Sequence, residues 1–129
     1  MKINHIALWV RDLEQMKAFY DKYFLIKSNE LYNNEKKGLK TYILSFKDGC
    51  RIEIMQIPEM QLLEKKDIRN YEGYCHISVS VGSEQEVKRL TDTLRNDGFP
   101  VLDGPRWTGE GYFESVILDP ENNRIELTV

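Results

Sequence analysis

The chain has 129 residues, 41% of them hydrophobic and 30% charged, which is enough for one domain with a substantial core. Its net charge of −3 and the lack of a basic stripe argue against a nucleic-acid partner, and no apolar run approaches the roughly 18 residues of a membrane span. The two cysteines provide no disulfide framework and no signal-peptide pattern is present, so we expect a cytoplasmic protein.

The first half of the chain predicts a strand, a helix and three more strands. Residues 2–10 alternate, with Ile6, Leu8 and Val10 on an apolar face and His5 on the other. Asp12 is the expected N-cap of the helix, because helical apolar spacing follows it. The further strands are expected at 26–33, 40–47 and 51–57, with Glu53 on the face opposite the core.

Residues 59–72 read as a short helix or a linker, and the same order of elements then returns. A strand is expected at 74–82, with Cys75 on its apolar face and His76 on the other, followed by a helix capped by Ser83. Later strands are expected at 99–103, 112–118 and 124–129, the last with Glu126 facing away from the core. The glycine-rich loop at 104–111 is either a lid or a plain hairpin connection.

The chain therefore predicts two βαβββ modules, an internal repeat made of residues 1–57 and 73–129 around a linker at 58–72. Each module places one histidine on its first strand and one glutamate on its last. A glutamate that points outward from a strand is usually only solvated. Because the four residues recur at matching positions and on matching faces, we predict instead that they form one site: His5, Glu53, His76 and Glu126.

Two imidazoles and two carboxylates suit a borderline divalent ion such as zinc, nickel, cobalt, manganese or iron. Four protein ligands on a curved sheet leave positions open for water or substrate. The ion would act as a Lewis acid, and a glutamate that can leave it would serve as a general base.

Several motifs carry a family resemblance. In the first half they are Asn4-His5-Ile6-Ala7-Leu8, Val10-Arg11-Asp12-Leu13, Phe19-Tyr20 and Arg51-Ile52-Glu53-Ile54. In the second half they are the strand around His76 and the run from Leu118 through Asp119-Pro120 to Leu127. With these motifs the whole chain resembles the vicinal oxygen chelate superfamily, which includes glyoxalase I, bleomycin-binding proteins and extradiol dioxygenases.

The resemblance implies an α+β fold in which two βαβββ modules form an eight-stranded cupped sheet around one divalent metal ion, zinc or nickel first. The His-Glu-His-Glu set is similar to that of glyoxalase I, which implies a lactoylglutathione lyase-like lyase or isomerase acting on a small carbonyl compound or its thiol adduct. Carried over, Glu126 is the first choice of base and Glu53 its counterpart. The resemblance also implies a homodimer, in which a site is built within one chain or across two.

Two residues depart from the glyoxalase I pattern at positions that concern recognition of the thiol. Trp9 and Ile57 stand where glyoxalase I has an arginine and an asparagine on the glutathione side, so the resemblance implies the metal chemistry without implying glutathione. If Trp9, Met55 and Ile57 face the cavity, they favour a more apolar substrate. The alternatives are a drug-binding protein without metal, a thiol transferase that modifies antibiotics, and a metal-dependent extradiol-type dioxygenase.

Overall fold

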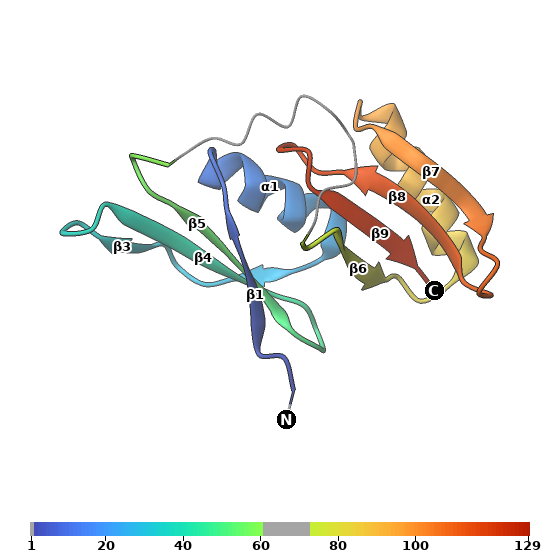
Figure 1. Ribbon diagram of the computed structural model, residues 1–129, viewed down its shortest axis with the longest axis horizontal. Coiled ribbons are helices and arrows are strands. Elements are labelled where there is room, and N and C mark those ends of the chain that lie inside the picture. The colour runs from blue at the N-terminus through green and yellow to red at the C-terminus, as the bar shows by residue number, and fades with distance from the viewer. Residues whose placement is uncertain (1, 61–72) are drawn as a thin grey trace. The chain divides into compact units, whose positions relative to one another are not determined.

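Each half of the chain folds as a mixed β-sheet with a helix against one face (Figure 1). The computed structural model describes residues 2–60 and 73–129, which belong to two compact units, unit 1 within Met1–Glu64 and unit 2 within Lys65–Val129. The order of elements in each unit is that of a βαβββ-like module, which confirms the predicted α+β class. None of the described helices is long and apolar enough to cross a membrane.

The strands of each unit follow one topology. In unit 1 the sheet order is β1-β5-β4-β2, with the short β3 also paired to β4, and in unit 2 it is β6-β9-β8-β7. The elements of unit 1 are β1 (His5–Trp9), α1 (Leu13–Phe24), β2 (Lys27–Ser28), β3 (Tyr32–Asn34), β4 (Leu39–Ser45) and β5 (Arg51–Gln56). Those of unit 2 are β6 (His76–Ser80), α2 (Glu84–Asn96), β7 (Val101–Trp107), β8 (Phe113–Leu118) and β9 (Arg124–Thr128).

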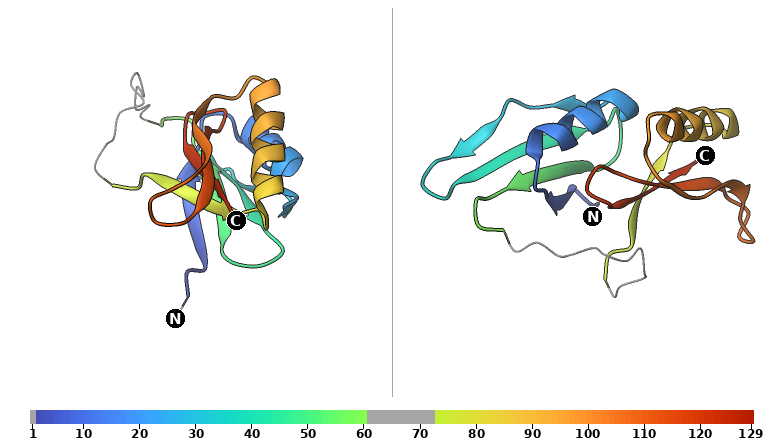
Figure 2. Two further views of the ribbon diagram at one scale, coloured as in Figure 1. Left: turned by 90° about the vertical axis from the view of Figure 1, so that its right-hand side faces the viewer. Right: turned by 90° about the horizontal axis from the view of Figure 1, so that it is seen from above.

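Both helices begin where the capping residues predict. The Asp12 carboxylate accepts a hydrogen bond from the Gln15 backbone N–H at 2.9 Å, and the Ser83 hydroxyl accepts one from the Glu86 N–H at 3.2 Å. Each helix lies against its own sheet, as the two views of Figure 2 show. The buried residues are Leu13, Met16, Phe19, Tyr20, Tyr23 and Phe24 in α1, and Val87, Leu90, Thr91 and Leu94 in α2.

The last strand of each module has one face against the helix. Ile52 and Ile54 of β5, and Ile125 and Leu127 of β9, are at most 2% exposed. Successive side chains of a strand point to opposite faces. Glu53 and Glu126, which lie between these buried residues in the sequence, therefore point to the face opposite the helix, as predicted.

Two details differ from the sequence-based expectations, and a third expectation is not tested. The strand expected at 26–33 is divided into β2 and β3, which both pair with β4. Between them the Asn29 side chain accepts a hydrogen bond from the Ile43 N–H of β4 at 2.6 Å, which interrupts the pairing with β4. Cys75 is exposed rather than part of the core, because β6 begins only at His76. Most of the segment expected as a short helix or linker, residues 61–72, lies outside the described residues.

The segment expected as a loop at 104–111 is largely strand. β7 continues to Trp107 through two register shifts against β8, and Pro105 is tolerated because β7 is an edge strand. Gly104 has a φ of 76°, and a Cβ there would lie 2.4 Å from the Glu114 carbonyl oxygen, so this close approach requires glycine. The remaining connection is closed by hydrogen bonds between Thr108 and Tyr112, which favours the hairpin over the lid.

The turn between β8 and β9 is organised by one buried carboxylate. Asp119 is 2% exposed, and its Oδ1 accepts hydrogen bonds from the backbone N–H groups of Glu121 and Asn123 at 2.9 and 2.8 Å. Its Oδ2 accepts another from the Asn123 side-chain amide at 2.7 Å. These bonds determine where β9 begins, and with it the strand position of Glu126.

We expect Asp119→Ala to lower the free energy of unfolding by about 2–4 kcal/mol, because it leaves buried N–H donors without their acceptor. Urea denaturation followed by circular dichroism measures the change. Asp48→Ala, in the exposed turn between β4 and β5, is the matched control and should change the free energy by less than about 0.5 kcal/mol. Equal stability of the two variants would contradict this role of Asp119.

Candidate metal centre

Unit 1 brings His5 and Glu53 together on adjacent parallel strands. β1 and β5 pair in a register that sets Ala7 beside Glu53, so His5 lies two positions before the glutamate on the same face. The His5 Nε2 atom lies 3.5 Å from the Glu53 Oε2 atom. The side chains are 43% and 24% exposed, so solvent reaches both groups.

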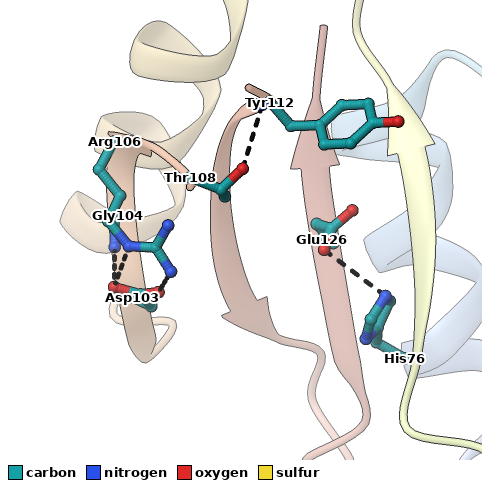
Figure 3. Close-up of polar contacts among 7 residues, drawn as sticks. All are labelled: His76, Asp103, Gly104, Arg106, Thr108, Tyr112 and Glu126. Carbon is teal, nitrogen blue, oxygen red and sulfur yellow. Dashed lines mark hydrogen bonds and ion pairs between the residues drawn. The ribbon is translucent and has the colours of Figure 1, made fainter. Parts of the chain in front are cut away.

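Unit 2 repeats this arrangement with His76 and Glu126. β6 and β9 pair in parallel with Ser78 beside Glu126, and the His76 Nε2 atom again lies 3.5 Å from the Glu126 Oε2 atom. Figure 3 shows the two side chains reaching toward each other from neighbouring strands. The same register and the same distance therefore occur twice, once in each module.

The separation within each pair suits two ligands of one metal ion. Ligand atoms about 2.1 Å from an ion lie about 3.0 Å apart in octahedral geometry and about 3.4 Å apart in tetrahedral geometry. A separation of 3.5 Å is longer than a good hydrogen bond and close to these values. Within either unit, the described residues form no group of three potential ligands, so each pair supplies two donors.

The environment of His5 determines which ring nitrogen faces Glu53. The Asn4 Oδ1 atom accepts a hydrogen bond from the Arg51 guanidinium, which can only donate, so this Asn4 atom is the oxygen. His5 Nδ1 lies 3.0 Å from that oxygen and must donate to it. In the neutral imidazole the lone pair is then on Nε2, the atom beside Glu53, which is the form a metal ion requires.

Unit 2 supports its pair with different residues. Cys75 precedes His76 as Asn4 precedes His5. The Arg124 Nη1 atom, from β9, donates to the Cys75 sulfur at 3.6 Å. Ser78 stands where unit 1 has Ala7, and its hydroxyl donates to Glu126 Oε1 at 2.6 Å. The two pairs therefore bring the same histidine and glutamate atoms together and differ in the residues that surround them.

A second carboxylate lies close to Glu126. Partial burial raises the pKa of Glu114 on β8, and the negative charge of Glu126 raises it further. On β7, hydrogen bonding to Arg106 lowers the pKa of Asp103 (Figure 3). The sheet face that carries His76 and Glu126 is thus rich in charge as well as open.

The residues expected to favour an apolar substrate are divided between two places. Trp9 is 51% exposed and pairs with Met55 in the β1–β5 register, so both lie on the face of His5 and Glu53. Ile57 instead lines a shallow cavity of about 360 Å³ beyond the end of β5. The other lining residues are Arg11, Gly38, Lys40, Gln56, Pro58 and Met60.

Asn4, Arg51 and Ser78 were not predicted as parts of the site. A signal for Arg51 was present, because Arg-Ile-Glu occurs in both modules as Arg51-Ile52-Glu53 and Arg124-Ile125-Glu126. The role of Asn4 depends on a contact with Arg51 across 47 residues, which no local pattern reveals. Ser78 is on the predicted face, but only the strand register shows that it contacts Glu126.

Comparison with known proteins supports the duplicated architecture. The profile of the Glyoxalase/Bleomycin resistance protein/Dioxygenase superfamily matches residues 2–127. The chain belongs to this superfamily. Its members are mostly enzymes, often bind divalent metal ions and small molecules, and often dimerise. A comparison with curated proteins finds no match.

Solved structures of the superfamily share the fold at low sequence identity. A possible glyoxalase from Bacillus cereus is 22% identical, with a TM-score of 0.71 and coverage of 100% of this chain and 99% of the other. The trypanothione-dependent glyoxalase I of Leishmania major is 19% identical, with a TM-score of 0.75 and coverage of 99% and 86%. A glyoxalase I mutant from Zea mays is 18% identical, with a TM-score of 0.78 and coverage of 98% and 44%. At these identities the likeness shows the fold alone.

We expect neutral His5 in the metal-free protein to be protonated on Nδ1, because Asn4 Oδ1 accepts that proton. Two-bond ¹H–¹⁵N correlation spectra identify the protonated nitrogen. Asn4→Leu should remove the preference for the Nδ1-protonated form in His5 and leave the spectrum of His76 unchanged. An Nε2-protonated His5 in the unsubstituted protein would contradict the arrangement.

Proposed function

We propose that His5, Glu53, His76 and Glu126 hold one divalent metal ion, and that the protein is a glyoxalase-like lyase or isomerase. The observation that carries the proposal is the duplicated pair, with the same register and the same 3.5 Å separation in both modules. Two neutral imidazoles and two carboxylates form a donor set for zinc or nickel first, and for manganese, cobalt or iron as alternatives.

The ion, when bound, would polarise a substrate carbonyl as a Lewis acid. In a substrate whose next carbon bears a hydroxyl group, such as the thiol adduct of a dicarbonyl compound, a glutamate would remove the proton from that carbon and return it to the former carbonyl carbon. The hydroxyl proton would pass to the former carbonyl oxygen, so the hydroxyl-bearing carbon becomes the new carbonyl carbon. The electron pair of the broken C–H bond forms a carbon–carbon double bond and, as the proton returns, ends in the new C–H bond. The result is an isomerisation that needs no oxidant or reductant. The resemblance makes Glu126 the first candidate for this base and Glu53 the second.

The substrate that suits this chain is a small carbonyl compound or its thiol adduct. Trp9 and Met55 on the face of His5 and Glu53 add apolar surface beside the pair. Trp9 also occupies the position at which glyoxalase I carries a cation for glutathione, so a thiol with fewer carboxylates is favoured.

We expect the protein purified without chelator to contain about one divalent ion per chain, and His76→Ala to lose it, because the variant lacks one nitrogen ligand. Elemental mass spectrometry gives the content. Turnover is measured on methylglyoxal with glutathione or cysteine and should fall with the metal. Glu84→Gln on α2 is the control and should retain both the metal content and the turnover.

Different outcomes separate the rival functions. Iron together with oxygen uptake would support a dioxygenase, and turnover of an antibiotic that requires a thiol would support a transferase. Failure to bind any metal ion, even after addition of nickel or zinc, would overturn the proposed function and favour a binding protein.

Mixing two inactive variants tests whether the site is built within one chain or across a homodimer. His5→Ala removes a ligand from unit 1 and His76→Ala removes one from unit 2. If one site uses unit 1 of one chain and unit 2 of its partner, co-refolded variants regain one intact site in each mixed dimer. Metal content and turnover should then recover to roughly a quarter of the unsubstituted level, since half of the dimers are mixed and each has one of its two sites. Without any recovery, the site lies within one chain.

A further inference from the structure

The two candidate bases differ in one neighbouring residue. The Glu126 carboxylate has two recorded partners, His76 at 3.5 Å and the Ser78 hydroxyl at 2.6 Å, and these occupy different oxygens. For Glu53, the single recorded partner among residues 2–60 and 73–129 is His5. The position that corresponds to Ser78 is Ala7, which has no donor group.

This difference follows from the strand register. Ala7 pairs with Glu53 and Ser78 pairs with Glu126, so the residue at this position always lies directly beside the glutamate. An O–H donor to a carboxylate at 2.6 Å forms a short, charge-assisted bond that restricts rotation of the carboxylate. Such partners of metal ligands orient the ligand and raise the metal affinity. An alanine methyl group does neither.

We propose that Ser78 is a positioning residue that keeps Glu126 as a permanent metal ligand, and that Glu53 is the carboxylate that leaves the ion and carries the proton. The inference rests on the proposed function and deepens it, because it assigns different roles to two glutamates that are otherwise equivalent. It reverses the order of the two bases that the resemblance alone suggests.

In this scheme Glu53 both removes and returns the proton. One carboxylate oxygen accepts the proton from the substrate carbon, and the same oxygen returns it to the neighbouring carbon. The group must rotate between the two carbons during this step. Glu53 has no hydrogen bond from a strand neighbour to break, whereas Glu126 would first have to lose its bond to Ser78.

The first arm of the test measures Co²⁺ binding and the absorption spectrum of the Co²⁺ protein, without substrate. Ser78→Ala should weaken Co²⁺ binding by roughly 10-fold or more and alter the spectrum. Ser78→Thr should restore both, because it keeps the hydroxyl. Ser80→Ala, two residues further along the same face of β6, is the matched control and should behave as the unsubstituted protein. Unchanged Co²⁺ binding in Ser78→Ala would overturn the role of Ser78.

The second arm compares substitutions of the two glutamates and of Ala7. Glu53→Gln should retain Co²⁺ within about 10-fold of the unsubstituted affinity and lose roughly 100-fold or more in kcat on methylglyoxal with the active thiol. Glu126→Gln should lose more Co²⁺ affinity than Glu53→Gln. Ala7→Ser, which gives Glu53 the neighbour that Glu126 has, should lower kcat by roughly 10-fold without weakening Co²⁺ binding.

Two results would overturn the assignment of the base. One is an unchanged kcat in Ala7→Ser, and the other is a larger loss of kcat at saturating metal in Glu126→Gln than in Glu53→Gln. A protein that binds Co²⁺ but shows either result would leave the proposed metal site standing. An unsubstituted protein that binds no Co²⁺ would instead overturn the proposed function itself.

Discussion

The parallel pairing of the first and last strands of each module is the constraint on which the site depends. Parallel neighbours require a crossover connection, and here the connection includes the helix that covers the apolar face of the sheet. Burial of Ile52, Ile54, Ile125 and Leu127 against the helices leaves Glu53 and Glu126 on the opposite face of each sheet. Packing of the core and presentation of His5 with Glu53, or His76 with Glu126, are thus two results of one arrangement.

The residues that support these matched pairs differ between the two units. Unit 1 holds its histidine through Asn4 and Arg51 and leaves its glutamate without a donor from the neighbouring strand position. Unit 2 holds its glutamate through Ser78. One module therefore orients its histidine and the other its glutamate. Two modules with the same strand pairing therefore carry different side-chain contacts.

The fold class and both His–Glu pairs could be predicted from the sequence, because they depend on signals that repeat locally. Strand alternation places His5, Glu53, His76 and Glu126 on the polar face whatever the tertiary details are. The capping residues Asp12 and Ser83 likewise act within three residues of their partners.

The features that were mispredicted depend on contacts between distant segments. The Asn29 side chain divides a strand through a bond to Ile43, and β7 continues through Pro105 as an edge strand with two register shifts against β8. Cys75 was assigned to the core from alternation alone, although the strand begins one residue later. The contact of Ser78 with Glu126 required the register of two strands, which the sequence does not specify by itself.

The pairing of first and last strands also has a consequence for folding kinetics. The Ser78–Glu126 contact closes 48 residues of chain, most of unit 2, and loop closure of this kind costs entropy before it is compensated by burial. The hairpins β7–β8 and β8–β9 join neighbours in sequence and can form without it. We therefore expect the His76–Glu126 pair to be among the last parts of unit 2 to assemble, so that its native separation would indicate that this unit has folded.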